Sequence, residues 1–289
     1  MKARSFIYRR PDDLNGALGL LADNAGDAQV LAGGQSLVPA MNMRLSSPGM
    51  VVDINRIGPL HGVEDRGDAI RVGALVRHAE ALASPVVSRC VPLLAMALPH
   101  VAHMAVRNRG TTCGSLALAD PAAETAAVAV ALDAAIVLRQ QGAERVVAAR
   151  DFFTGLYQTA RRQTEIITEV LFPRATETDV FGFSELCRRH GDFAIVGVAV
   201  RARKVANRLA GIDAVVFGSE VRPRLSRTAR NAVIAADAAD SVLREFAWEV
   251  AQEMEPMADH RGRGETKRRQ AAVILARVLR DMGRRAFDA

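Results

Sequence analysis

Two glycine-containing segments hold the residues of this chain whose types and spacing best suit ligand binding. The first glycine segment, residues 32–37, reads Ala-Gly-Gly-Gln-Ser-Leu, and the second glycine segment, residues 110–115, reads Gly-Thr-Thr-Cys-Gly-Ser. Glycine permits positive φ and lets successive backbone N–H groups converge on an anion without a Cβ in the way. Both segments therefore suit a phosphate group, although a plain turn also explains adjacent glycines.

Neither segment matches a common nucleotide-binding motif. No Gly-Lys-Ser/Thr follows the second glycine segment, so it is not a Walker A loop, and neither segment has the Gly-x-Gly-x-x-Gly pattern of nicotinamide dinucleotide enzymes. Two phosphate-type segments about 80 residues apart suggest one extended diphosphate ligand held between two lobes, as a dinucleotide requires.

Other side chains offer weaker chemistry. His100 and His103 could share a helix face and a metal ion, but no third ligand lies nearby in the sequence. Cys113 could be a reactive thiol, although a lone cysteine among small residues is more often inert packing. Asp120 and Glu124 lie four residues apart, and helix capping or binding to ligand hydroxyls explains them better than acid–base catalysis.

Composition excludes several classes of protein. The chain has 289 residues, a length that suits one large domain or two to three small ones. Its 38 basic and 32 acidic side chains give a net charge of +6, and a hydrophobic content of 49% suits a folded protein. The apolar run 128–138 is too short to cross a bilayer and residues 1–10 form no signal peptide, so we expect a cytoplasmic protein. Basic residues are dispersed without interleaved aromatics, so nucleic-acid binding is not expected.

The hydrophobic pattern predicts the elements that must position the two glycine segments. Strands are expected over residues 29–32, 50–54, 70–74, 126–138, 144–149 and 166–172, with a hairpin of 194–200 and 210–217. Helices are expected after Pro11, over 76–82 and 92–105, and in two stretches after residue 240, whereas 107–115 should be a loop. A domain boundary is expected between residues 173 and 180, and 261–264 should form a solvated loop.

Four motifs in order resemble the FAD-binding medium subunit of molybdenum hydroxylases, the family of the carbon monoxide dehydrogenase medium chain and the xanthine dehydrogenase FAD subunit. The motifs occupy residues 32–39, 107–117, 119–124 and 188–194. The resemblance implies an α+β protein with a two-lobed FAD-binding domain of the vanillyl-alcohol-oxidase (PCMH) type. Its lobes would be residues 1–55 and 56–175, followed by a small α+β C-terminal domain, residues 176–289.

The same resemblance implies a non-covalent FAD and assigns residues to it. The two glycine segments would hold the diphosphate, Asp120 and Glu124 would reach sugar or ribityl hydroxyls, and Ile167 and Phe193 would lie near the adenine or flavin ring. No catalytic or metal-binding residue is expected. The cofactor-binding set is Ala32, Gly33, Gly34, Gln35, Ser36, Leu37, Gly110, Thr111, Thr112, Cys113, Gly114, Ser115, Asp120, Glu124, Ile167 and Phe193.

The sequence departs from the family pattern at three positions in two motifs. Thr112 and Cys113 stand where the family usually has Ile-Gly, and Leu118 replaces a histidine that often precedes Ala-Asp-Pro. A Cβ at position 113 costs nothing if φ there is negative. FAD binding is therefore still expected.

The implied function is electron transfer within a larger enzyme. A molybdenum-pterin large subunit would hydroxylate the substrate, a small subunit with 2Fe–2S clusters would relay electrons, and FAD in this chain would pass them to an external acceptor. A heterohexamer, as a dimer of heterotrimers, is expected. Two alternatives remain open: a stand-alone FAD-dependent oxidase or dehydrogenase, and a non-enzymatic interaction protein that has lost its flavin.

Overall fold

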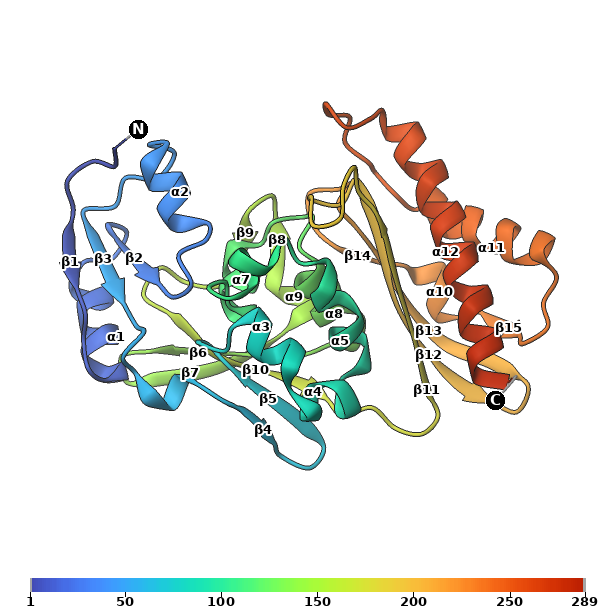
Figure 1. The fold of residues 1–289 in the computed structure, drawn as a ribbon, viewed down its shortest axis with the longest axis horizontal. Coiled ribbons are helices and arrows are strands. Elements are labelled where there is room, and N and C mark those ends of the chain that lie inside the picture. Colours follow the sequence, from blue (N-terminus) through green and yellow to red (C-terminus); the bar gives the residue numbers. More distant parts are fainter. Residues whose placement is uncertain (1, 288–289) are drawn as a thin grey trace.

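The first lobe is a small parallel sheet at the N-terminal end of the molecule. The computed structural model describes residues 2–287, and this sheet has the order β1-β3-β2 (Figure 1). Asp13 caps the first helix by accepting a hydrogen bond from the Gly16 N–H (2.7 Å), and Leu18 and Leu21 bury its inner face. The elements are β1 (Ile7–Arg9), α1 (Leu14–Asp23), β2 (Ala28–Leu31), α2 (Leu37–Asn42) and β3 (Met50–Asp53).

The second lobe is built on a five-stranded antiparallel sheet of order β4-β5-β10-β6-β7. Its strands are β4 (Val63–Asp65), β5 (Ala69–Gly73), β6 (Ala135–Gln140), β7 (Ala143–Ala148) and β10 (Ile166–Pro173), with the hairpin β8 (Phe153–Gly155) and β9 (Gln158–Thr159). Its helices are η1 (Gly58–Leu60), α3 (His78–Ala83), α4 (Pro85–Cys90), α5 (Pro92–Ala97), η2 (Leu98–His100), α6 (Met104–Arg107), α7 (Thr112–Leu118), α8 (Glu124–Leu132) and α9 (Ala149–Phe152).

The C-terminal part is an antiparallel sheet with the order β11-β12-β13-β14, and two long helices, α11 and α12, cover its outer face (Figure 1). The opposite face packs on α5 and α8 of the second lobe. Its elements are β11 (Asp179–Leu186), β12 (Val196–Val205), β13 (Arg208–Phe217), β14 (Arg224–Leu225), α10 (Arg227–Arg230), β15 (Val233–Ala235), α11 (Asp240–Gln252) and α12 (Gly264–Phe287).

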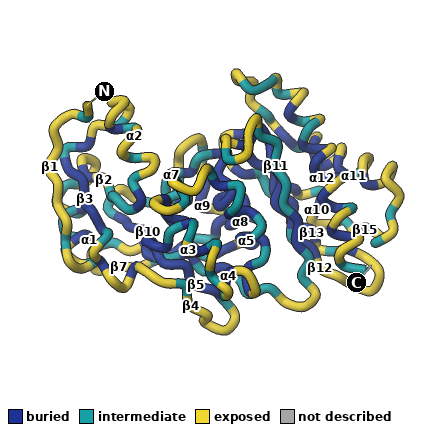
Figure 2. Tube along the Cα trace, in the orientation of Figure 1, coloured by how far each residue is buried: buried dark blue, intermediate teal, exposed yellow. Residues whose placement is uncertain are grey.

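This sheet belongs to two hydrophobic cores at once. Alternate residues of a strand point to opposite faces, so Ala199 and Phe217 join the core of the second lobe, whereas Val198 and Val200 join the core under α11 and α12. Residues 196–200 of β12 and 214–217 of β13 are accordingly buried (Figure 2). Packing on both faces therefore holds the C-terminal sheet against the second lobe.

The structure confirms most of the predicted elements and corrects three. The helix after Pro11, the β12–β13 hairpin, strand β7 near the predicted 144–149 and both C-terminal helices are present. Residues 126–132 are helical rather than a strand. Helix α8 is buried on every side, so its sequence lacks the helical period that would have distinguished it from a buried strand.

The other two corrections concern the second lobe. The helix predicted over 92–105 is broken into α5, η2 and α6, because Pro99 and the positive φ of Ala102 (43°) interrupt it. The predicted loop 107–115 gives way to α7 from Thr112 onward. His100 and His103 therefore do not share a helix face.

Within residues 2–287, none of the helices has the length and apolar character that crossing a bilayer would require.

Candidate functional site

The two glycine segments meet across one cleft of about 850 Å³ between the lobes and the C-terminal domain. Every residue of the predicted cofactor-binding set lines it except Thr112, which is fully buried behind the wall. A cleft of this volume is within the range of about 300–1,000 Å³ found for small-molecule and cofactor sites. The fold therefore brings together residues that are up to about 160 positions apart in the sequence.

The first glycine segment touches the second lobe directly. A Cβ on Gly33 would lie 2.4 Å from the Arg109 carbonyl oxygen and 2.8 Å from the Gly110 Cα, distances that real Cβ atoms do not reach. Gly34 has a φ of +74°, in the left-handed region that favours glycine. Both glycines are therefore required by the backbone, one for close approach and one for its conformation.

The second glycine segment turns into helix α7. Thr111 is the N-cap, and its Oγ1 accepts a hydrogen bond from the Gly114 N–H (3.0 Å). A Cβ on Gly114 would lie 2.6 Å from that same oxygen, and one on Gly110 would lie 3.0 Å from the His78 ring. Small residues here keep the backbone close to the cleft.

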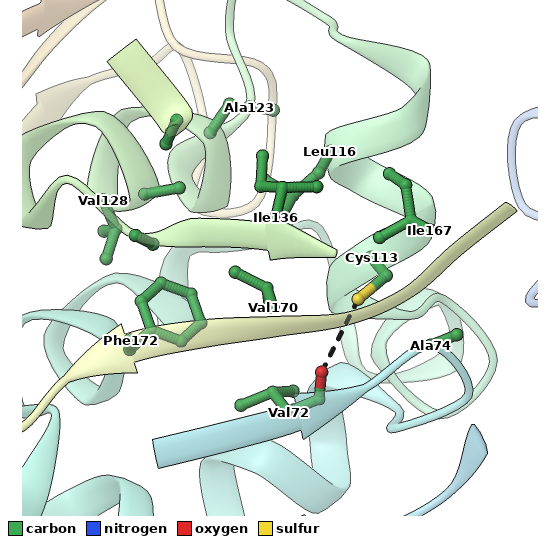
Figure 3. Close-up of a cluster of buried hydrophobic side chains, with 14 of the residues drawn as sticks. Val72, Ala74, Cys113, Leu116, Ala123, Val128, Ile136, Ile167, Val170 and Phe172 are labelled. Carbon is green, nitrogen blue, oxygen red and sulfur yellow. Dashed lines mark hydrogen bonds between the residues drawn. The ribbon is translucent and has the colours of Figure 1, made fainter. Parts of the chain in front are cut away.

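Cys113 lies in the first turn of α7, with a helical backbone of negative φ, so its side chain adds no strain. Its sulfur points toward the Val72 carbonyl oxygen at 3.7 Å, among apolar side chains of the core (Figure 3). Burial raises the pKa of the thiol to about 12, so it stays protonated. The packing role is therefore the one that the geometry supports.

The two acidic residues differ in character. Asp120 accepts hydrogen bonds from the Ala122 N–H (2.8 Å) and from the Tyr157 hydroxyl (3.1 Å). Glu124 is the first residue of α8, and burial, helped by the charges of Glu185 and Asp120, raises its pKa to about 8. Glu124 therefore carries a proton at pH 7, which lets it both donate to and accept from a hydroxyl group.

Ile167 and Phe193 face the cleft from different walls. Ile167 on β10 is buried in the floor, and Phe193, which follows β11 in the C-terminal domain, is 63% exposed at the rim. An exposed aromatic side chain beside an apolar floor suits the face of a planar ring.

The C-terminal wall of the cleft contains residues that are outside the predicted cofactor-binding set. Arg261, predicted in a solvated loop, instead lines the cleft, and its Nη1 donates to the Ala194 carbonyl oxygen (2.8 Å). Arg188 donates to the His260 carbonyl oxygen (3.1 Å). These contacts join two segments about 70 residues apart in the chain, and no local sequence pattern predicts them.

Three further cleft residues, all in the second lobe, are also absent from the predicted cofactor-binding set. His78 lies under Gly110, and burial lowers its pKa to about 4, so its imidazole is neutral. Arg161 and Glu165 line the cleft beside β10, and burial lowers the pKa of Arg161. No sequence pattern marks His78, because its contact with Gly110 arises from the tertiary fold.

Metal binding has no support in the part of the chain that the structure describes, where no cluster of three His, Cys, Asp or Glu side chains is placed to hold an ion. His100 instead contacts Glu185, with 3.3 Å between Nδ1 and Oε1.

Glycine segments from two lobes line one cleft, and the C-terminal domain forms its third wall. This arrangement is typical of a two-lobed dinucleotide-binding domain. A family model described as the FAD binding domain in molybdopterin dehydrogenase matches residues 4–175, and one described as the CO dehydrogenase flavoprotein C-terminal domain matches residues 181–282. The chain belongs to the family of FAD-binding medium subunits of molybdenum hydroxylases.

Individual relatives agree with this assignment. The glyceraldehyde dehydrogenase medium chain of Sulfolobus acidocaldarius is 31% identical over 96% of this chain and 98% of its own length. The caffeine dehydrogenase subunit beta of a Pseudomonas strain is 40% identical over 69% of this chain and 68% of its own. A solved structure of carbon monoxide dehydrogenase from Hydrogenophaga pseudoflava matches with a TM-score of 0.94 and 31% identity, covering 99% of both chains.

This chain is therefore an FAD-binding oxidoreductase subunit of α+β fold. The residues present fit that cofactor, because both glycine segments keep their backbone close to one cleft that is large enough for a dinucleotide. The molybdenum-pterin and iron–sulfur centres belong to partner subunits.

Proposed function

We propose that the cleft holds FAD with its diphosphate between the two glycine segments. Asp120 and Glu124 face its sugar or ribityl hydroxyls, and Ile167 and Phe193 lie near its rings. The division into lobes 1–55 and 56–175 and a C-terminal domain 176–289 follows the same picture, because each range carries its own sheet.

The observation that carries this proposal is the contact between Gly33 and the Arg109–Gly110 backbone. It joins two sequence motifs from different lobes at the wall of one cleft, with no side chain between them. An anion lying across this junction meets backbone from both lobes, as a diphosphate requires.

The residues of the cleft position the cofactor rather than perform acid–base catalysis. Bound FAD supplies the ability to take up electrons one at a time and release them in pairs. Glu124, protonated at neutral pH, adds no negative charge beside a diphosphate, and the neutral His78 adds no proton-exchanging cation. Phe193, at the rim, shields one face of the ligand from water.

The proposed assembly is a dimer of heterotrimers. Each trimer consists of this chain, a molybdenum-pterin subunit that hydroxylates the substrate and a small subunit whose 2Fe–2S clusters relay electrons to this flavin. The flavin then passes them to an external acceptor.

The experiment is to replace Gly33 with alanine and measure bound FAD. Gly33→Ala places a Cβ against the Arg109 carbonyl oxygen, so the two segments separate and the purified chain should lose most of its flavin. FAD is extracted by denaturation and measured by absorbance against protein concentration.

Gly19→Ala is the matched control, because nothing lies within 4 Å of a Cβ at that position. It should retain the FAD content of the unmodified chain. Equal FAD content in Gly33→Ala and Gly19→Ala would show that the diphosphate does not lie at this junction.

A further inference from the structure

Two residues outside both glycine segments connect them from behind. The Asn55 side-chain amide donates to the Ala32 carbonyl oxygen (2.9 Å) of the first glycine segment. Arg77 donates through Nη2 to the Asn55 Oδ1 (2.6 Å) and through Nη1 to the Arg109 carbonyl oxygen (2.6 Å), which directly precedes the second glycine segment. A continuous chain of hydrogen bonds therefore links the two segments across the lobes.

The Asn55 amide is itself held in one orientation. Its Nδ2 also donates to the Asp53 Oδ1 (2.6 Å), and its backbone N–H donates to the same oxygen (2.9 Å). The other oxygen of Asp53 accepts from the Tyr8 hydroxyl (2.5 Å) on β1. Asp53 ends β3, so the central strand of the first lobe fixes the orientation of Asn55.

Arg77 is equally well anchored on the second lobe. Its backbone forms an isolated antiparallel bridge with Thr111, and the next residue, His78, donates its N–H to the Gly110 carbonyl oxygen (2.9 Å). Burial lowers the pKa of Arg77, with a further contribution from the charge of Arg109, so the guanidinium is desolvated but still charged. A half-buried cation is retained where its hydrogen bonds are needed.

The target of this clamp is the junction on which the cofactor site depends. The Arg109 carbonyl oxygen that accepts from Arg77 is also the atom nearest to a Cβ built on Gly33, at 2.4 Å. Neither Asn55 nor Arg77 lines the cleft, so neither is placed to touch a ligand there. They can act only through the backbone of the two segments.

We propose that Asn55 and Arg77 are positioning residues that fix the separation of the two glycine segments and thereby set the affinity for a diphosphate spanning them. This inference rests on the proposed location of the FAD diphosphate. A planar guanidinium serves this purpose because its two Nη groups reach acceptors on both sides, whereas an ammonium group has one compact centre.

The test is a double-mutant cycle on the full-length chain, with the FAD dissociation constant measured by quenching of flavin fluorescence. Arg77→Met and Asn55→Ala should each weaken FAD binding about ten-fold or more, since each breaks the same chain of charge-assisted hydrogen bonds. The double variant should be no weaker than the weaker single variant, because the two residues act as one unit. Independent, additive losses would overturn the proposal.

Arg77→Lys separates a clamp from simple charge attraction. It keeps the positive charge but cannot bridge both acceptors, so it should bind FAD about as weakly as Arg77→Met. Recovery of the original affinity in Arg77→Lys would mean that only charge matters and would overturn the clamp.

Arg56→Met is the matched control. Arg56 lies next to Asn55 in sequence, is exposed, and pairs only loosely with Asp12 at 3.8 Å, so removing its charge should leave the dissociation constant unchanged. Melting of the FAD-free variants verifies folding, and Arg77→Lys remains informative if Arg77→Met does not fold.

Failure of the clamp can be distinguished from failure of the proposed FAD site. If Gly33→Ala loses FAD while the Asn55 and Arg77 variants bind it normally, the site stands and the clamp is wrong. If Gly33→Ala binds FAD normally, the assumed location of the diphosphate is wrong.

Discussion

At the scale of single residues, burial keeps two titratable side chains of the cleft, Glu124 and His78, uncharged. Glu124 sits at the start of α8, where a helix dipole favours a carboxylate, yet burial dominates and raises its pKa to about 8. His78 shows the opposite direction from the same cause, since burial lowers its pKa to about 4. Neither side chain therefore adds a charge to its part of the cleft.

The raised pKa of Glu124 predicts a pH dependence of stability. Below its ordinary value of 4.5 the carboxyl is protonated in both the folded and unfolded states, so its contribution is fully present. Between pH 4.5 and about 8 only the unfolded chain releases the proton, and stability falls by about 1.4 kcal/mol for each unit of the pKa difference at most. Above pH 8 the loss is complete.

Glu124→Gln, which mimics the protonated form, should remove this dependence. The stability advantage of the variant over the unmodified FAD-free chain should grow from pH 5 to pH 8 and then level off, as measured by urea unfolding. Parallel stability curves for the two chains across that range would contradict the assignment.

At the scale of elements, the sequence predicted segments with a clear period and failed where packing removes the period. Helices α11 and α12 each have one polar and one apolar face, so their sequences show a helical period. Strands β5 and β10 are short apolar runs, which predict buried strands. Helix α8 is buried on all sides between two sheets, so an apolar run of small residues resembled a strand.

The site was predictable to the extent that it lies in contiguous motifs. Both glycine segments follow from sequence, whereas Asn55, Arg77 and Arg261 reach the site through the tertiary fold. Their neighbours in the chain carry no pattern that marks them. Side chains that act on a backbone from behind are therefore the part of a cofactor site that sequence alone misses.

The burial of α8 predicts that it tolerates no added volume. Ala127 is fully buried, and Ala127→Leu should destabilise the chain by about 1–3 kcal/mol, because extra methylene groups force neighbouring side chains and backbone to shift. Val242→Leu on the exposed side of α11 is the control and should change stability little. An unchanged urea midpoint for Ala127→Leu would show that the space between the sheets is looser than described.

At the scale of the whole molecule, several arginines form ion pairs inside the fold. Arg71, Arg145 and Arg201 each pair with a largely buried carboxylate, namely Glu169, Glu165 and Asp179. The planar guanidinium suits such pairs. These three arginines therefore form contacts within the fold in addition to contributing to the net charge.

The first lobe has the surface that a partner would be expected to cover. Strand β1 is the edge of its sheet, and Phe6, Ile7 and Tyr8 on and beside it are each at least 40% exposed. An open strand edge with apolar side chains is a liability for a chain that remains alone.

Affinity purification of this chain from its native host should therefore recover two further chain types, with molybdenum and iron in those chains and FAD in this one. The chain expressed alone should bind FAD and show no hydroxylase activity, because the molybdenum-pterin centre belongs to a partner subunit and, within residues 2–287, no three His, Cys, Asp or Glu side chains are placed to hold a metal ion. Metal analysis and mass spectrometry of the purified material check both statements. Recovery of this polypeptide by itself, together with unaided oxidation of a small substrate, would replace the subunit with a stand-alone flavoenzyme.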